Sequence, residues 1–284
     1  MYNKKILVLV SRNGRKILIL LTVIVIVVII VNAVIFANYN DKLLENKIII
    51  IDPGHGGVDG GTTDYSVFFE KDINLNIAQK LKEELVSENA IVELTRDGDY
   101  SLDDRNNSST SRHKRDLISR VSQFNSGKYD IFISLHVNRS SNKKAIGPII
   151  LYSAKIPSTE LLAGCMQDSL NEYIKKALGV SVRHNAVRSD YYILVNSNIP
   201  GVIVETGFIS NPKEKLLLMN EGNQSKLVKY IKYGIKDYLK SIHDINASSR
   251  EDQFPQDSLP EGEERFPSNT GNDIYVADKQ NLSR

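Results

Sequence analysis

The sequence predicts an α/β fold of three layers, in which a largely parallel, twisted sheet carries helices on both of its faces. Over residues 47–240, short apolar runs alternate with segments whose apolar residues recur every three or four positions. The runs are typical of strands buried on both faces, and the recurring pattern is typical of amphipathic helices. Strands and helices that alternate along a chain favour a parallel sheet covered by helices. We therefore expect one domain over residues 47–240.

The composition of the 284-residue chain narrows its class. With 36 basic and 34 acidic residues, the net charge is +2, which argues against nucleic-acid binding. The single cysteine, Cys165, excludes an internal disulfide and a multi-cysteine metal site. The charge is distributed unevenly, since residues 1–16 carry a net charge of +5 and residues 241–284 a net charge of −5. Both ends therefore differ in character from the domain between them.

An uncharged, apolar segment covers residues 17–37. As a helix at ~1.5 Å per residue it would be roughly 31 Å long, which matches the hydrocarbon core of a bilayer. A buried core helix would have a polar stripe, and a cleaved signal peptide would have an apolar stretch of only ~7–15 residues. We therefore predict an uncleaved single-pass anchor between a basic cytoplasmic segment, residues 1–16, and a linker, residues 38–46. In this topology the rest of the chain lies on the outer side of the cell membrane.

The first half of the domain contains alternating strands and helices. Each predicted strand is a run of mostly apolar residues, and each predicted helix has an apolar stripe at three- or four-residue spacing. The elements are, in order, a strand over residues 48–51, a helix that begins at Asp72, a strand over 91–95, a helix over 115–124 and a strand over 131–135.

The second half of the domain continues the alternation. We expect a strand over residues 148–152, a helix capped by Ser158 that extends to residue 178, a short strand over 191–195, a buried strand over 202–204 and a closing helix over 227–239. The acidic segment of residues 241–284 contains three prolines and few apolar residues. Because such a composition buries too little apolar surface to offset chain entropy, we predict a disordered tail.

Titratable side chains gather where three of the buried strands end. His55 follows the first strand of the domain, His136 follows the strand over 131–135, and Glu205 follows the strand over 202–204. The carboxyl ends of parallel strands meet at one edge of a sheet, where functional residues collect. Glu70 lies just before the first helix, on a loop that starts at His55 and can fold back toward it.

Two imidazoles and one carboxylate form a common catalytic zinc set with a fourth position open for water. We therefore predict that His55, Glu70 and His136 bind Zn²⁺, which lowers the pKa of that water toward ~7. Glu205 follows three buried aliphatic residues, where an acid without a role would be costly. We assign it as the catalytic base and acid. Each of these residues taken alone also has an ordinary structural explanation.

The glycines around His55 do not match a nucleotide-binding loop. No Gly-Lys-Ser/Thr sequence follows them, and Asp59 stands at the third position of a dinucleotide fingerprint that starts at Gly54. We expect these glycines to let the backbone approach the metal closely. Arg96 ends the second strand. Two roles are possible for its side chain there, a bond to a substrate carboxylate and a structural ion pair.

Four blocks of this sequence resemble the zinc-dependent N-acetylmuramoyl-L-alanine amidases, the amidase type 3 family of bacterial cell-wall hydrolases. The blocks occur in the family's order, at residues 52–57, 70–72, 134–138 and 204–211. In that family the two histidines and the first glutamate of these blocks bind zinc, and the last glutamate is catalytic. The resemblance thus implies the same roles for His55, Glu70, His136 and Glu205. It also implies cleavage of the amide between N-acetylmuramic acid and L-alanine.

Within the family, a short amidase domain behind an N-terminal anchor is most similar to the germination-specific, spore-cortex branch. This similarity implies a peptidoglycan glycan-peptide substrate and a role in cortex formation or germination. The sequence makes no prediction of an activating protein partner. Two other functions stay open, a zinc peptidase that cuts within the stem peptide and a non-catalytic peptidoglycan-binding module.

Overall fold

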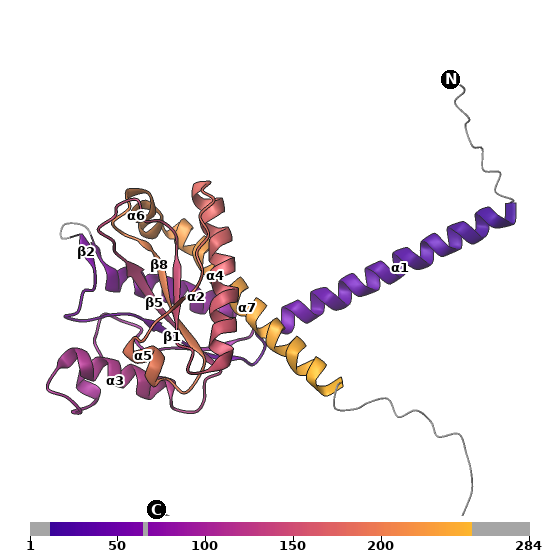
Figure 1. The fold of residues 1–284 in the computed structure, drawn as a ribbon. Coiled ribbons are helices and arrows are strands. Elements are labelled where there is room, and N and C mark those ends of the chain that lie inside the picture. The colour runs from indigo at the N-terminus through magenta and orange to yellow at the C-terminus, as the bar shows by residue number, and fades with distance from the viewer. Residues whose placement is uncertain (1–11, 65–67, 252–284) are drawn as a thin grey trace, which may run out of the picture. The chain divides into compact units, whose positions relative to one another are not determined.

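The central sheet of the protein has six strands, and helices cover both of its faces (Figure 1). The computed structural model describes residues 12–64 and 68–251. In spatial order the strands are β4 (Ile91–Leu94), β1 (Ile48–Pro53), β5 (Ile131–Asn138), β8 (Gly201–Phe208), β6 (Ile149–Tyr152) and β7 (Val187–Arg188). The first four are mutually parallel, and β6 is antiparallel to β8 but parallel to β7. The prediction of a largely parallel sheet in an α/β fold is confirmed.

Helices and one hairpin lie before, between and after these strands along the chain. The helices are α1 (Arg12–Lys42), α2 (Glu70–Val86), α3 (Arg112–Phe124), α4 (Pro157–Leu178), α5 (Tyr192–Asn196), α6 (Pro212–Met219) and α7 (Glu221–Glu251), with a 3₁₀ turn, η1, at Asp103–Arg105. The two short strands β2 (Thr63–Asp64) and β3 (Phe68–Phe69) pair antiparallel just before α2. This hairpin was not predicted from the sequence.

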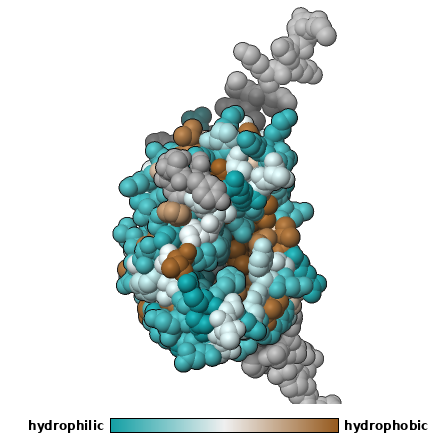
Figure 2. Space-filling view, turned by 90° about the vertical axis from the view of Figure 1, so that its left-hand side faces the viewer, coloured by the Kyte–Doolittle hydropathy of each residue, from teal (hydrophilic) through white to brown (hydrophobic). Residues whose placement is uncertain are grey.

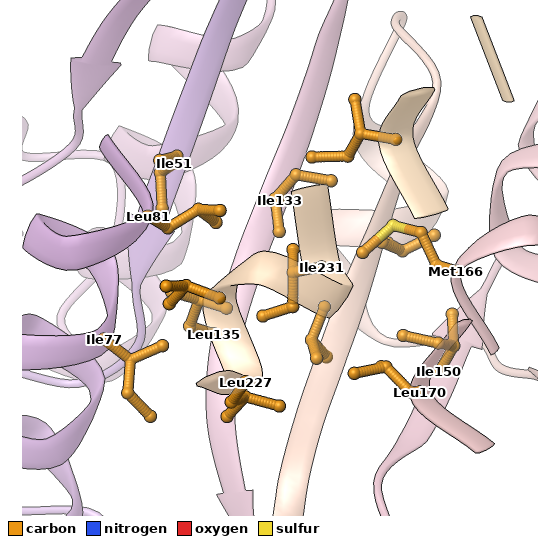
Figure 3. Close-up of a cluster of buried hydrophobic side chains, with 14 of the residues drawn as sticks. Ile51, Ile77, Leu81, Ile133, Leu135, Ile150, Met166, Leu170, Leu227 and Ile231 are labelled. Carbon is orange, nitrogen blue, oxygen red and sulfur yellow. The ribbon is translucent and has the colours of Figure 1, made fainter. Parts of the chain in front are cut away.

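Two apolar clusters fill the spaces between the sheet and its helices. Because successive strand residues point to opposite faces, Ile49 and Ile51 belong to the first cluster and Ile50 to the second. The first cluster includes the apolar faces of α2, α4 and α7, and Figure 3 shows Leu81 of α2 beside Ile51. The second includes residues of α3 and α5. The sheet therefore forms the middle of three layers, as the sequence predicted.

Residues 191–195 do not form the predicted short strand. They contribute to α5, where the N–H groups of Leu194 and Val195 bond to the carbonyl oxygen of Tyr191 at 2.9 and 3.1 Å. Ile193 and Leu194 are buried in the second cluster. A short apolar run suits a buried helical turn as well as a strand, so its pattern did not separate the two. In the sheet, β5 and β6 already occupy both edges of β8.

Two helix boundaries differ from the prediction for local reasons. Ser158 does not cap α4, because the helix begins at Pro157, and Ser158 is its second residue. Proline suits the first position of a helix, where its missing N–H is not needed. The helix expected to open at Asp72 begins at Glu70 instead. This shift makes Glu70 the first residue of α2.

The closing helix α7 is longer than the predicted helix over 227–239. It begins at Glu221 and extends to Glu251, so residues 241–251 of the predicted disordered tail are helical. The hydroxyl of Ser241 donates to the carbonyl oxygen of Asp237 at 2.8 Å, within the helix. The rest of the predicted tail, residues 252–284, lies outside the described residues.

The predicted anchor, residues 17–37, lies entirely within α1. The stretch Gly14–Asn32 is long and apolar enough to cross a membrane, and none of it is buried within the structure. Of the predicted basic segment, residues 1–11 lie outside the described residues. In the expected linker, Leu43 and Leu44 are buried, and Leu44 belongs to the first apolar cluster.

Candidate metal centre

Three of the predicted site residues converge at the carboxyl ends of β1 and β5. His55 lies two residues after β1, His136 lies within β5, and Glu70 opens α2. Each of the three offers a ligand atom, and these atoms all lie within 4.8 Å of one another. Two imidazole nitrogens and one carboxylate oxygen are the donors of a common catalytic zinc set, so the residues fit this metal.

Glu70 lies between the two imidazole rings. Its Oε1 atom is 3.2 Å from Nε2 of His55 and 3.1 Å from Nδ1 of His136. Main-chain N–H groups hold the same carboxylate, from Thr62 to Oε2 at 2.7 Å and from Val137 to Oε1 at 2.9 Å. The Glu70 residue is only 3% exposed. The carboxylate is therefore fixed by the backbone on two sides.

The hairpin of β2 and β3 brings Glu70 back to His55. Thr63 pairs with Phe69 across the hairpin, and the N–H of Glu70 donates to the carbonyl oxygen of Thr62 at 2.9 Å. The chain thus leaves the end of β1, reverses direction, and returns to begin α2 beside its starting point. The sequence predicted this return of Glu70 but not the pairing that produces it.

The backbone at His55 and Gly54 has an unusual conformation and close contacts. His55 itself has φ +62°, a conformation that side chains other than glycine rarely adopt. At Gly54, a Cβ atom would lie 2.2 Å from Cε1 of His136. Gly54 therefore makes room for the ring of a ligand residue, which differs from the predicted close approach of the backbone to the metal.

Two buried arginines hold this loop by its carbonyl oxygens. Arg96 donates to Pro53 and Gly54, both at 2.9 Å, and Arg120 donates to Pro53 at 3.0 Å and His55 at 2.7 Å. Arg96 is 1% exposed, so it does not meet a substrate carboxylate. Its side chain donates hydrogen bonds to backbone carbonyl oxygens, so Arg96 has neither of the two roles predicted from the sequence, a bond to substrate or a structural ion pair.

A buried carboxylate neutralises Arg120. Asp52 forms an ion pair with Arg120 and accepts hydrogen bonds from Thr95 at 2.6 Å and Ser134 at 2.7 Å. Burial alone would raise the pKa of Asp52, but the charge of Arg120 and these hydroxyl donors lower it. Asp52 therefore stays ionised and keeps the arginine in place beneath His55.

Glu205 lies on β8, directly opposite His136 of β5 in the strand register. The sequence placed it after the last strand, whereas β8 continues to Phe208 and includes it. Burial raises the pKa of the Glu205 carboxyl, His136 and His55 oppose this rise, and the charge of Glu70 adds to it. A carboxyl group of raised pKa beside a cluster of metal-binding side chains is suited to proton transfer.

The ligand cluster attracts positive charge. Burial alone would lower the pKa of His55, but hydrogen bonds to Asp59 and Glu70 raise it to about 9. The pKa of Glu70 is well below its usual value, since bonds to the two histidines outweigh the effect of its burial. Carboxylates that stabilise the positive charge of an imidazolium also stabilise a divalent cation bound within the same cluster. The electrostatics thus agree with the donor set.

Two residues beside the ligands were missed by the sequence analysis. Asp59 lies 2.9 Å from Nδ1 of His55, and the amide nitrogen of Asn74, in α2, lies 3.4 Å from Oε1 of Glu70. Asp59 was considered only as a mismatch to a nucleotide loop. Its position four residues after a candidate ligand, in a glycine-rich loop, was the signal that could have identified it.

A cavity of about 390 Å³ adjoins the centre on the side of α3. Its lining includes His55, Asp59, Ser101, Arg112 and His113. Figure 2 shows the face that carries β2 and α3, and most of its surface is hydrophilic. The region around the centre is thus suited to a polar ligand.

Comparison with known proteins places the chain among cell-wall hydrolases. The family model described as "N-acetylmuramoyl-L-alanine amidase" matches residues 49–237. A germination-specific N-acetylmuramoyl-L-alanine amidase of Bacillus subtilis (strain 168) is 34% identical over 196 residues, which cover 69% of this chain and 81% of the relative.

Solved structures give the same result. The CwlD amidase from Clostridioides difficile, in complex with the GerS lipoprotein, is 35% identical with a TM-score of 0.62, and the match covers 69% of this chain and all of that one. An N-acetylmuramoyl-L-alanine amidase from Clostridium difficile 630 is 31% identical with a TM-score of 0.59, covering 69% of this chain and 98% of the other.

Proposed function

Because the chain belongs to the N-acetylmuramoyl-L-alanine amidase family, we propose that it is a zinc-dependent hydrolase of peptidoglycan, cleaving the amide between N-acetylmuramic acid and L-alanine. The observation that carries the proposal is the cluster of His55, Glu70 and His136, with Glu205 opposite His136 on the adjacent strand. This donor set supports zinc as the metal. The cavity beside the cluster is lined by polar and charged side chains, among them Asp59, Arg112 and His113, which supports a polar glycan-peptide substrate.

In this proposal each residue of the centre has a distinct task. His55, Glu70 and His136 would hold Zn²⁺, which when bound would supply an activated water and polarise the scissile carbonyl. Glu205 accepts the proton of the attacking water and later donates it to the leaving nitrogen of L-alanine. The water oxygen bonds to the lactyl carbonyl carbon and the C–N bond breaks, so the lactyl group ends as a carboxylate and L-alanine gains a free amino group. The raised pKa of Glu205 suits it to both steps.

We further propose that α1 anchors the chain in the cell membrane. Its apolar stretch Gly14–Asn32 and the basic residues 1–16 favour a cytoplasmic N-terminus, with the domain of residues 47–240 on the cell-wall side. Protease added to intact protoplasts should then digest the domain and spare α1. Protection of the domain would contradict this topology.

A role in spore-cortex formation or germination is the finer part of the proposal. It is supported by the named activity of the Bacillus subtilis relative. The Clostridioides difficile relative was solved with a lipoprotein, which makes an extracytoplasmic protein partner worth seeking for this chain as well.

The proposed reaction can be tested by digestion of purified sacculi. We would incubate the full chain, in detergent, with sacculi in the presence and absence of zinc, and identify the released products by mass spectrometry. Intact stem peptides that begin with a free L-alanine amino group are expected, and only with zinc. Peptides cut internally would instead indicate a stem peptidase. Binding to sacculi without release of products would indicate a peptidoglycan-binding module.

A further inference from the structure

Asp59 lies in the loop between the first two proposed ligands and contacts the ring of one of them. Its Oδ2 atom is 2.9 Å from Nδ1 of His55, and its Oδ1 accepts the N–H of Gly61 at 3.1 Å. Its backbone forms a two-way bridge with Gly56, with N···O distances of 2.9 and 3.2 Å. The carboxylate is therefore held on both sides while it faces the imidazole.

This contact determines which nitrogen His55 presents to the centre. In the neutral ring, the form that binds a metal, a nitrogen that donates its hydrogen to a carboxylate leaves the other nitrogen with a free lone pair. In His55 the other nitrogen is Nε2, which lies 3.2 Å from Oε1 of Glu70 and faces the cluster. Metal-binding histidines are commonly oriented by such a carboxylate partner.

The same loop connects Asp59 to the second proposed ligand. From Gly61, bonded to Asp59, the chain passes directly to Thr62, whose N–H donates to Oε2 of Glu70 at 2.7 Å. A Cβ atom on Gly61 would lie 2.7 Å from that oxygen and 2.7 Å from Cδ2 of His55. The loop segment held by Asp59 thus packs closely against both side chains.

The carboxylate of Asp59 contributes little to the stability of the fold. The side chain of Asp59 is 45% exposed, whereas that of Asp52 is 1% exposed and paired with a buried arginine. An exposed acid whose side chain contacts a histidine ring and one loop N–H contributes little to folding. The contact with His55 therefore points to a role of Asp59 at the metal centre.

We propose that Asp59 is a positioning residue that orients the His55 ring and raises the affinity of the centre for zinc. The inference rests on the proposed function, since it requires that the cluster binds a metal. Removing a carboxylate partner of this kind typically weakens metal binding by about 10- to 100-fold.

The test is a measurement of zinc affinity in the full chain, by competition with a chromophoric chelator. Asp59→Ala should raise the zinc dissociation constant about 10- to 100-fold, and Asp59→Asn should raise it less. The matched control is Asp104→Asn, which removes one negative charge from an exposed position in η1 and should bind zinc like the wild type. Dissociation constants for both Asp59 variants within twofold of the wild type would overturn the inference.

Two further measurements, the unfolding midpoint and the cleavage of peptidoglycan, distinguish a loss of folding or of activity from a loss of zinc affinity. The unfolding midpoint of each metal-free variant shows whether it is folded, and if Asp59→Ala fails to fold, Asp59→Asn decides the question. A wild type that binds zinc and does not cleave peptidoglycan would contradict the proposed function and leave the role of Asp59 intact. A wild type without zinc affinity would contradict both.

Discussion

Glu205 stands apart from the proposed ligands by its position on a separate strand, across from His136. If it transfers the proton and does not hold the metal, Glu205→Gln should lower the rate of cleavage by roughly 10²- to 10⁴-fold. The same variant should keep its zinc, since the three ligands are unchanged. Activity assays and metal analysis on one preparation check both expectations. Loss of zinc together with activity would make Glu205 a ligand instead.

Arg120 is one of the two buried arginines that hold the loop of His55 by its carbonyl oxygens. Its replacement by leucine would leave Asp52 buried without its ion-pair partner, and the carbonyl oxygen of His55 without this donor. We expect Arg120→Leu to lower the free energy of unfolding by about 3–5 kcal/mol, as for other broken buried ion pairs. Denaturant unfolding at neutral pH measures this loss. A loss below about 1 kcal/mol, the range of surface pairs, would show that the pair does not support the fold.

Ion pairs join the end of α2 to α7. Glu88, just after α2, lies 2.7 Å from Lys232 and 2.5 Å from Lys236 on α7. Burial would raise the pKa of Glu88, but hydrogen bonds to the two lysines lower it from 4.5. A carboxyl whose pKa is lower in the folded state stabilises the fold above the unfolded pKa. That stability is lost as the pH falls through the folded value.

This contact gives a pH-dependent prediction. At neutral pH, Glu88→Gln should reduce the free energy of unfolding by about 0.5–1 kcal/mol, as expected for partly exposed ion pairs. The difference from the wild type should shrink as the pH falls below 4.5 and through the lowered pKa of folded Glu88, because Glu88 then becomes protonated and loses its charge. Thermal unfolding of both proteins across this pH range is the measurement. A difference that stays constant or grows in acid would contradict this explanation.

Elements with a strong pattern could be predicted from the sequence, and elements defined by their neighbours could not. The runs that contain Ile50, Phe132 and Ile203 are strands because a sheet covered on both faces requires apolar residues at every position. The run around Ile193 satisfies the same rule but folds as α5. Both edges of β8 are already occupied, and this information is not contained in a local pattern.

The candidate site shows the same division. His55, His136 and Glu205 could be found because each interrupts or ends an apolar run with a side chain that can bind metal or transfer a proton. Asp59 lies in a loop, and its contact with the imidazole depends on the backbone bridge to Gly56 and on the unusual φ of His55. Such contacts depend on the folded loop and leave little trace in residue spacing.

For the molecule as a whole, the sheet delivers two histidines and a glutamate to one edge, and the hairpin returns a fourth side chain to them. The buried arginines and Asp52 keep the first loop in place without facing the substrate. A membrane anchor at one end would confine this centre to the surface where peptidoglycan is built and removed. The fold, the centre and the family therefore agree on one kind of enzyme.

In the proposed function, one zinc ion held by His55, Glu70 and His136 is needed for cleavage. The most direct test is to strip the full chain of metal and titrate zinc back while following the release of stem peptides. We expect activity to be absent at the start and to rise linearly to saturation at one zinc per chain, and His136→Ala to remain inactive under the same titration. Full activity in the metal-free protein, or saturation unaffected by His136→Ala, would contradict the claim.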